Sequence, residues 1–472
     1  MSMFRDLPVE VGVVFEGERI RGLDAYIEFG GINVPIKFEL AEVKPPEKIT
    51  DGKIEIVGPD ISALKENGSH PLGIYLEVAG EKLEKDLEGV IERNIHTFLN
   101  YIEGVMHIGS RYDIWVRLSR NSYKKGLNSF KQLGLVLCRL FKVQFPIIEK
   151  IQVTFLTDEK RIKELYDKAM KIYEERDARA RGLQDEDVSE FYGCVMCQSF
   201  APTHVCIITP SRISLCGAIS WFDARAAVRI NPKGFNFKVE KGKCLDPVKG
   251  EYSGINEKVK EESLGEVDRI TLHSFTDHPH TACGCFEAVA FYIPEVDGIG
   301  IVHRGHSGQT VNGLSFSTIA SEAGGGKQVE GLVGIAIEYL RSPKFFQADG
   351  GWNRVVWLPA TVKERIKAAI PKELENKIPT ENEVKTIDEL KQFLEEHNHP
   401  VVVCWKAPAV PIAPAILANP TTTVGGANKG GVGIGIPGLI PSAAIPAEGL
   451  RILLKGVKIH VDKLIIKKAE EK

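Results

Sequence analysis

Cys194-Val-Met-Cys197-Gln-Ser-Phe-Ala-Pro-Thr-His-Val-Cys206, followed shortly by Cys216, is the stretch that decides what kind of fold this 472-residue chain must build. A second group, Cys283-Gly-Cys285, follows later in the chain. Four thiolates in one short segment can close a tetrahedral zinc site or hold a cubane iron-sulfur cluster, because both need four soft ligands. Cysteine is also often simply buried. The sequence therefore predicts either a metal centre made by one segment or an unusually cysteine-rich core.

The spacing C-x2-C-x8-C-x9-C narrows these alternatives. Structural zinc sites usually combine two close pairs of ligands, whereas only Cys194 and Cys197 are close here. The two common ferredoxin runs do not match either. For this segment alone an iron-sulfur cluster is the preferred interpretation, and zinc and unligated core cysteines stay open.

The tripeptide Cys283-Gly-Cys285 indicates a different metal. Two thiolates one residue apart, together with the intervening backbone nitrogens, can offer four coplanar donors, and Ni(II) is the leading candidate for such a square-planar N,S site. Gly284 suits the position because a missing side chain lets the backbone close around an ion. The alternative is a flexible turn with two ordinary thiols.

The residues from Phe191 to Gly217 resemble the A-cluster region of acetyl-CoA synthase, and so does Ala282-Cys-Gly-Cys-Phe-Glu-Ala288. The resemblance extends from about Leu72 to Val403. It is specific, because the four-cysteine spacing and a distant C-G-C would rarely coincide by chance. The form that the chain most resembles is the archaeal one, the beta subunit of the acetyl-CoA decarbonylase/synthase (CO dehydrogenase/acetyl-CoA synthase) complex.

The resemblance implies a metal centre with two parts. One is a 4Fe-4S cluster held by the four cysteines of the first group, which are Cys194, Cys197, Cys206 and Cys216.

The other part is a pair of nickel ions. The resemblance implies that the Cys197 sulfur also bridges to a proximal nickel, and that Cys283 and Cys285 bridge this nickel to a distal one. The distal nickel would also take the backbone nitrogens of Gly284 and Cys285. Phe200 matches the aromatic residue beside the proximal nickel, where it would restrict ligand access. Core packing is the other interpretation of this phenylalanine.

The function implied is that of a CO-methylating acetyl-CoA synthase, an acyltransferase of methanogenesis or the Wood-Ljungdahl pathway. It would assemble acetyl-CoA from CO, CoA and a methyl group carried by a corrinoid iron-sulfur protein, or cleave acetyl-CoA into these parts. CO dehydrogenase subunits would be its partners. Two other classes stay open: an electron-transfer iron-sulfur subunit, which would not need Cys283-Gly-Cys285, and a zinc-stabilised scaffold subunit, which would need neither iron nor nickel.

A cluster of arginines is the candidate CoA site. The segment from Arg111 to Arg120 also contains Trp115 and Arg117. Arginine pairs bidentately with phosphate and tryptophan can stack on a base, and in the family resembled the corresponding domain is implicated in CoA binding. The alternative is a half-buried strand whose arginines form surface ion pairs.

Composition is that of a globular enzyme, at 43% hydrophobic residues. Lys and Arg, 60 in all, nearly balance the 63 Asp and Glu, so no nucleic-acid partner is expected. No apolar run predicts a membrane span and the first residues are not a signal peptide, so we expect a cytoplasmic protein with reduced cysteines. Compared with the bacterial enzyme, we expect the chain to begin near that family's middle domain.

The predicted fold is mixed α/β and multidomain. A mixed domain with the candidate CoA site is expected at 1–157, a charged linker helix at 158–186 and the metal domain at 187–406. The stretch 407–446 is rich in Pro, Ala and Gly and predicts a linker, and 447–472 predicts a β docking element.

Hydrophobic periodicity predicts individual elements within these domains. Strands are expected at 9–15, 53–57, 113–118 and 150–155, and helices at 84–102, 158–180 and 387–397.

Two further motifs are weak. His278-Pro-His280 could join a nearby cysteine in a zinc site, although the cysteines have a better use. Gly324-Gly-Gly-Lys327 has some likeness to a phosphate loop but lacks the full pattern.

Overall fold

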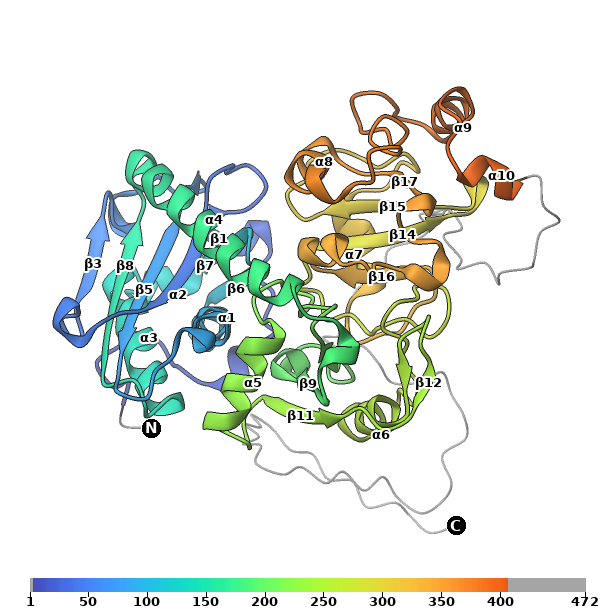
Figure 1. Ribbon diagram of the computed structural model, residues 1–472. Coiled ribbons are helices and arrows are strands. Elements are labelled where there is room, and N and C mark those ends of the chain that lie inside the picture. Colours follow the sequence, from blue (N-terminus) through green and yellow to red (C-terminus); the bar gives the residue numbers. More distant parts are fainter. Residues whose placement is uncertain (1–2, 406–472) are drawn as a thin grey trace, which may run out of the picture. The chain divides into compact units, whose positions relative to one another are not determined.

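The computed structural model describes residues 3–405, which all fall in one contact unit, Met1–Ile416. Helices and mixed sheets follow one another through this part (Figure 1), which confirms the mixed α/β class. The predicted linker at 407–446 and β element at 447–472 lie outside the described residues. The domain boundaries therefore stay predictions.

The first sheet of the N-terminal half has the strand order β4-β1-β7-β6. β7 pairs antiparallel with both β1 and β6, and β4 joins the edge of β1 in parallel. Buried residues alternate with half-buried ones along β7, as expected for a strand that packs one face on a core. The strands are β1 Ala25–Gly30, β4 Ser69–His70, β6 Val105–Ser110 and β7 Asp113–Ser119.

The second sheet has the order β2-β5-β8-β3, in which β5 is antiparallel to β8 and the two outer pairings are parallel. β5 is buried along nearly its whole length because helices and loops cover it. The strands are β2 Phe38–Val43, β3 Ile54–Val57, β5 Gly73–Ala79 and β8 Lys150–Leu156.

Helix α1, Glu88–Asn100, is the helix that positions the site. Every one of its residues is buried, and it contacts β2, β6, α3 and α5. Such a helix lacks a solvent face, so its polar residues need partners inside the protein. The other helices of this half are α2 Arg120–Lys124, α3 Phe130–Gln144 and α4 Glu159–Arg181.

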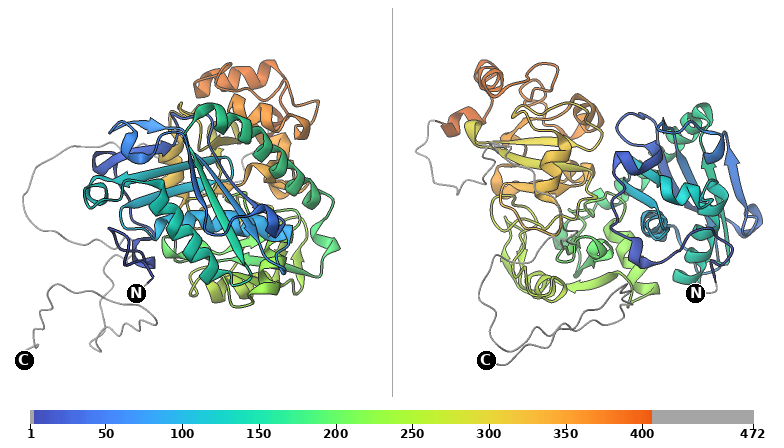
Figure 2. Two further views of the ribbon diagram at one scale, coloured as in Figure 1. Left: turned by 90° about the vertical axis from the view of Figure 1, so that its left-hand side faces the viewer. Right: turned by 180° about the vertical axis from the view of Figure 1, so that it is seen from behind.

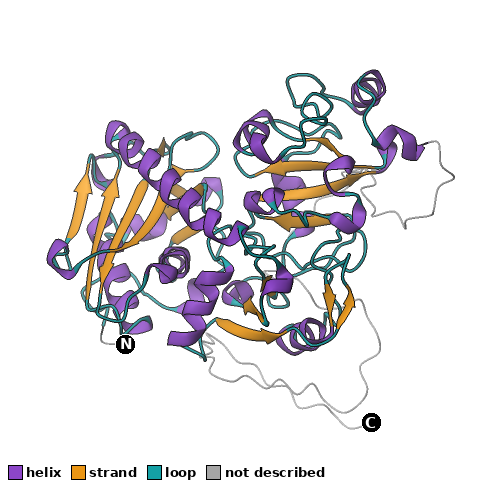
Figure 3. Cartoon of the chain, in the orientation of Figure 1, coloured by secondary structure: helices purple, strands orange, loops and turns teal. Residues whose placement is uncertain are grey.

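The C-terminal half contains a three-stranded sheet, β10-β9-β11, a β12-β13 pair and a four-stranded sheet, β16-β14-β15-β17. Figure 3 shows long loops between these elements, and the six cysteines of the two groups lie on such loops, on a 3₁₀ turn or at strand ends. The strands are β9 Glu190–Cys194, β10 Cys206–Ile208, β11 Asn236–Glu240, β12 Cys244–Asp246, β13 Glu251–Tyr252, β14 Ala288–Ile293, β15 Gly298–His303, β16 Leu332–Ile335 and β17 Val355–Trp357.

The helices of this half are short, three of them have a side-chain cap at their first turn, and Figure 2 shows them from two further sides. Ser220, Ser315 and Thr386 each accept a backbone N–H as N-caps, the residue types that such positions favour. The helices are α5 Trp221–Ile230, α6 Ser253–Glu262, α7 Phe316–Ala323, α8 Ala360–Arg365, α9 Ile387–Glu396 and α10 Val401–Trp405.

Most of the elements predicted from periodicity are confirmed. α1, α4 and α9 lie where helices were expected, and β3, β7 and β8 where strands were expected. The strand expected at 9–15 is wrong: this segment contains an isolated bridge at Val11 and a 3₁₀ turn at Val13–Phe15. Val13 and Val14 are mostly exposed there, so their alternation with polar residues does not report a buried face. Helix α3 was missed.

No helix within residues 3–405 is long and apolar enough to cross a membrane.

Candidate metal centre

Two cysteines of the first group are fixed by a strand pairing. β9 ends at Cys194 and β10 begins at Cys206, and these two residues are direct partners in an antiparallel register. Directly opposed residues of an antiparallel pair project from the same face of the sheet, so both thiols lie on one side. Cys197 follows on the 3₁₀ turn Met196–Ser199.

Cys216 sits in a tight turn closed by a hydrogen bond from the Gly217 N–H to the Ser214 carbonyl, at 2.9 Å. Gly217 has a φ of +75°, which favours glycine at this place. The Ser214 hydroxyl lies 3.4 Å from the Cys216 sulfur. The turn thereby holds a buried thiol at a defined position.

Burial determines the acidity of these thiols. It raises the pKa of Cys194 to about 12, and it also raises the pKa values of Cys206 and Cys216. These groups are therefore thiols at neutral pH unless a cation replaces the protons, as a bound metal does.

The Cys283-Gly-Cys285 tripeptide forms a compact turn. The Cys285 N–H points to the Cys283 sulfur at 3.3 Å, and Gly284 has a φ of +125°. A Cβ on Gly284 would meet nothing within 4 Å, so the glycine is required by the backbone conformation and not by a close approach of another atom.

The loop Gly324-Gly-Gly-Lys327, which has some likeness to a phosphate loop, instead holds this turn. Its backbone N–H groups at Gly325 and Gly326 donate to the carbonyls of Cys283 and Ala282, at 3.0 and 2.8 Å. These two amides are thus committed to the cysteine turn and not free for a phosphate.

The two cysteine groups meet at Cys197. Cys283 is within hydrogen-bond reach of both Cys197 and Cys285, and these three residues form one small cluster with Ala201 and Phe200. The hydrogen bond from Cys283 lowers the pKa values of the Cys197 and Cys285 thiols.

Helix α1 of the N-terminal half supplies the polar wall of this cluster, which the sequence reasoning did not identify. The Arg93 Nη2 lies 3.5 Å from the Cys197 sulfur, and the His96 Nε2 lies 3.8 Å from the Cys285 sulfur. One sequence pattern could have revealed this wall: Arg93, His96 and Asn100 recur at helical spacing and therefore share one face of α1. All faces of this helix are buried.

A chain of imidazoles leads away from Cys285. The His96 Nδ1 is 2.8 Å from the His107 Nδ1, and the other ring nitrogen of His107 bonds to the Glu39 carboxylate. Burial lowers the pKa of His96 to about 3, so this ring is neutral. Asn100 anchors the pair by accepting from the His107 N–H at 2.8 Å and donating to its carbonyl at 2.9 Å.

A cavity of about 580 Å³ reaches the cysteine turn, because Gly284 and Cys285 line it. Phe200 lines it as well, with its ring centroid 6.3 Å from that of His96. Phe200 thus packs on the cysteines and forms part of the cavity wall beside them, and its role in restricting ligand access stays a prediction.

The candidate CoA residues are placed very differently from one another. Arg111 is buried in an ion pair with Asp177, which is not the surface pair of the alternative but leaves the guanidinium no access to a ligand. Trp115 lines the cavity, and the Arg117 guanidinium stacks on its ring at 3.9 Å.

Arg117 and Arg120 are also engaged within the protein. Arg117 pairs with Glu28 at 2.7 Å, and Arg120 pairs with Glu66 at the surface. The structure thus brings Trp115 and Arg117 together beside the cavity and leaves Arg111 and Arg120 apart from them. A role for these residues in CoA binding stays a prediction.

Two alternative metal sites do not fit. His280 uses both ring nitrogens on backbone groups, with Nε2 accepting from the Ile207 N–H at 2.9 Å and Nδ1 2.6 Å from the Thr281 carbonyl. It therefore offers no lone pair to zinc.

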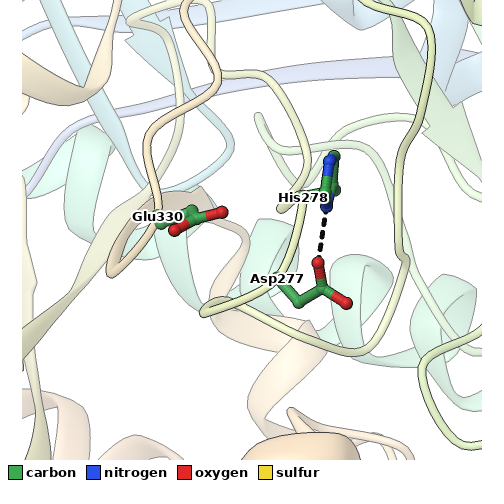
Figure 4. A group of neighbouring side chains, drawn as sticks. All are labelled: Asp277, His278 and Glu330. Carbon is green, nitrogen blue, oxygen red and sulfur yellow. Dashed lines mark hydrogen bonds and ion pairs between the residues drawn. The ribbon is translucent and has the colours of Figure 1, made fainter. Parts of the chain in front are cut away.

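The ligand atoms of Asp277, His278 and Glu330 lie close together (Figure 4). However, the Asp277 carboxylate is already 2.6 Å from the Lys249 ammonium and 3.7 Å from the Arg269 guanidinium. Since two cations already compensate the charge of this carboxylate, we do not assign a metal site to these three residues.

Comparison with known proteins covers nearly the whole chain. Residues 7–162 match the family model of the CO dehydrogenase/acetyl-CoA synthase complex beta subunit, and residues 173–405 match the model for the C-terminal part of the ACS/CODH beta subunit.

Two relatives match end to end. An acetyl-CoA decarbonylase/synthase complex subunit beta 2 of Methanosarcina thermophila is 48% identical, with 99% of each chain covered. A subunit beta 2 of Methanocaldococcus jannaschii is 50% identical, with 99% of this chain and 98% of the relative covered. A solved C-terminal domain of an acetyl-coenzyme A synthase alpha subunit is 37% identical over 26% of this chain and 96% of its own, with a TM-score of 0.24.

Proposed function

Because the chain belongs to the family of acetyl-CoA decarbonylase/synthase complex beta subunits, we propose that it is a CO-methylating acetyl-CoA synthase, an acyltransferase. Its reaction would be the reversible assembly of acetyl-CoA from CO, a methyl group and CoA. The observation that carries the proposal is the convergence of Cys197, Cys283 and Cys285 at the end of a cavity.

The residues present fit the metal group of this chemistry. The donor set consists of soft sulfurs that are buried or, at Cys197, half-buried, and that in the described part of the chain form no disulfides. The four cysteines of the first group would hold a 4Fe-4S cluster. Cys197, Cys283 and Cys285, with the backbone nitrogens of Gly284 and Cys285, would hold two nickel ions. When bound, this group supplies the low-valent metal that joins a methyl group to CO and passes the acetyl group to CoA.

The chain's own residues prepare the place for this chemistry. Arg304 donates to the carbonyls of Gly284 and Phe286, at 2.6 and 3.1 Å, and so fixes the cysteine turn from the cavity side. Phe200 narrows the cavity beside Cys285, which limits the size of what reaches the sulfurs. Trp115 lines the cavity, and the part of its ring that the Arg117 guanidinium does not cover would stack on the adenine base of CoA.

The partners follow from the reaction. We expect a methylated corrinoid iron-sulfur protein as methyl donor, CO dehydrogenase subunits as the source of CO, and free CoA and acetyl-CoA, all in the cytoplasm. No contact with nucleic acid or membrane is part of the proposal.

The test is metal analysis and acetyl exchange on the chain purified without oxygen and loaded with iron, sulfide and nickel. We expect about four iron and two nickel per chain, with exchange of the acetyl group between acetyl-CoA and CoA. Iron without nickel would indicate the electron-transfer alternative. Zinc alone would indicate the scaffold alternative.

A further inference from the structure

Arg93 is a buried cation with an unusual set of neighbours. Its side chain is 5% exposed, and none of the ion pairs found among residues 3–405 includes it. Nη1 donates to the Gly109 carbonyl at 2.9 Å, and Nη2 donates to the Cys197 sulfur at 3.5 Å. The Cys285 sulfur is also within its hydrogen-bond reach.

Other buried arginines of the same half have carboxylates. Arg176 bonds to Glu88 and Glu92, at 3.0 and 2.9 Å, and Arg111 pairs with Asp177. A buried charge without such a partner costs several kcal/mol in stability. The Glu16 carboxyl also feels the charge of Arg93, but the groups within hydrogen-bond reach of the guanidinium that can take this part are the sulfurs of Cys197 and Cys285.

We propose that Arg93 is a positioning residue of the metal centre, whose guanidinium is the counter-charge of the sulfurs and donates a charge-assisted hydrogen bond to Cys197. The inference rests on the proposed function, since it assigns a partner to the metal ligands named there. Cys197 is the sulfur that would belong to both the iron-sulfur cluster and the nickel site. Arg93 therefore acts where the two parts meet.

The fork geometry explains why the residue is arginine. One amino group is anchored on the Gly109 carbonyl of β6, and this leaves the second aimed at the sulfur. A lysine ammonium on this stem could carry the charge but could not hold both contacts. Hydrogen bonds and positive charge near a cluster sulfur make reduction easier, and outer partners of this kind typically change metal affinity 10- to 100-fold.

The experiment compares R93Q and R93K with the native chain after loading with iron, sulfide and nickel. The readouts are nickel release to a chelator, iron content, and the reduction potential of the cluster followed by EPR. For R93Q we expect a 10- to 100-fold weaker hold on nickel and a more negative potential, with iron kept. For R93K we expect a potential close to the native one but weaker nickel binding.

Arg212 provides the matched control. It is 1% exposed, donates to the Leu272 carbonyl, forms none of the ion pairs found in the described part of the chain, and does not contact a cysteine of the site. R212Q should cost stability without moving the potential or the nickel affinity, so it separates loss of a buried charge from loss of the sulfur contact.

Each outcome either supports or contradicts the role proposed for Arg93. Native nickel affinity and potential in R93Q, with iron retained, would overturn the inference. If R93Q does not fold, native nickel affinity in R93K overturns it instead, because lysine cannot hold both contacts. A native chain that takes up no nickel contradicts the proposed function, whereas a native chain with nickel and unaffected Arg93 variants contradicts this inference alone.

Discussion

The two halves of the chain contribute different chemistry to the candidate metal centre. The C-terminal half brings sulfur, from loops and strand ends between Cys194 and Cys285. The N-terminal half brings nitrogen, from Arg93 and His96 on one buried helix. The sulfurs are the proposed ligands, and the nitrogens contact those ligands. The proposed ligands of this centre therefore come from one half of the chain, and the charged and polar groups around those ligands come from the other half.

The largest effects should separate the two cysteine groups of the C-terminal half. C206S should remove iron and nickel together, because Cys206 is a proposed cluster ligand and a strand partner of Cys194. C283A should remove nickel and leave most of the iron. Metal analysis of both variants, with C138A as a buried cysteine outside the site, measures this. Equal loss of both metals in C283A, with the fold intact, would contradict the division.

Substitutions on helix α1 of the N-terminal half should change the free energy of unfolding. Asn100 bonds to both backbone groups of His107 and to the His96 carbonyl, whereas Asn94 on the same helix bonds to the Val90 carbonyl alone. N100A leaves buried backbone groups without partners, so we expect a loss of about 2 to 4 kcal/mol in the free energy of unfolding.

N94A is the control for this change, and its expected loss is below about 1 kcal/mol. Urea titration of both variants gives the comparison. Equal losses would show that the hydrogen bonds around His107 add nothing to the stability of α1.

A substrate contact in the N-terminal half would sharpen the comparison further. R117A should weaken CoA binding about tenfold, or roughly 1.5 kcal/mol, because a charge-assisted contact to phosphate is lost beside Trp115. Metal content should stay the same. The binding of CoA is measured by calorimetry, with R139A, a surface arginine paired with Asp6, as the control. Unchanged affinity in R117A would leave Arg117 as the ion-pair partner of Glu28.

The smallest effect concerns a buried histidine of the C-terminal half outside the site. Burial lowers the pKa of His399 to about 4. The unfolded chain therefore binds more protons than the folded one between about pH 6.5 and 4, and stability falls as the pH falls through this window. From pH 7 to 5.5 the contribution of His399 is about 1 kcal/mol.

The H399Q variant should lose this part of the pH dependence. Its glutamine amide can still donate to the Val355 carbonyl, which the His399 Nε2 reaches at 3.0 Å. Urea unfolding of both chains at pH 7 and 5.5 gives the difference. An identical pH dependence in the two would mean that His399 does not titrate in this range.

The sequence predicted local features well where a periodic pattern reports a buried face. Helices α1, α4 and α9 have such a pattern and lie where expected. The segment 9–15 also contains a run of apolar and polar residues, but Val13 and Val14 are exposed there, so this part of the pattern does not correspond to a buried face. A pattern indicates which residues could share a face, and only packing determines whether another element covers that face.

The arginine segment shows the same limit at the level of function. Arg111, Arg117 and Arg120 look alike in sequence, yet a carboxylate neutralises each of them. Their partners Asp177, Glu28 and Glu66 are far away along the chain. Charge pairing of this kind cannot be derived from a local motif, because it depends on which strands and helices become neighbours.

The sequence by itself determined the family and the proposed donor set. Cysteine spacing within one segment, with the C-G-C turn and its glycine, specifies soft ligands for a metal because such ligands are few and their spacing is local. Tertiary structure alone decided that Cys197 meets Cys283 and Cys285, that α1 sets Arg93 and His96 against them, and that a cavity reaches this point. These outcomes depend on distances between segments remote in the chain, which packing fixes and spacing does not.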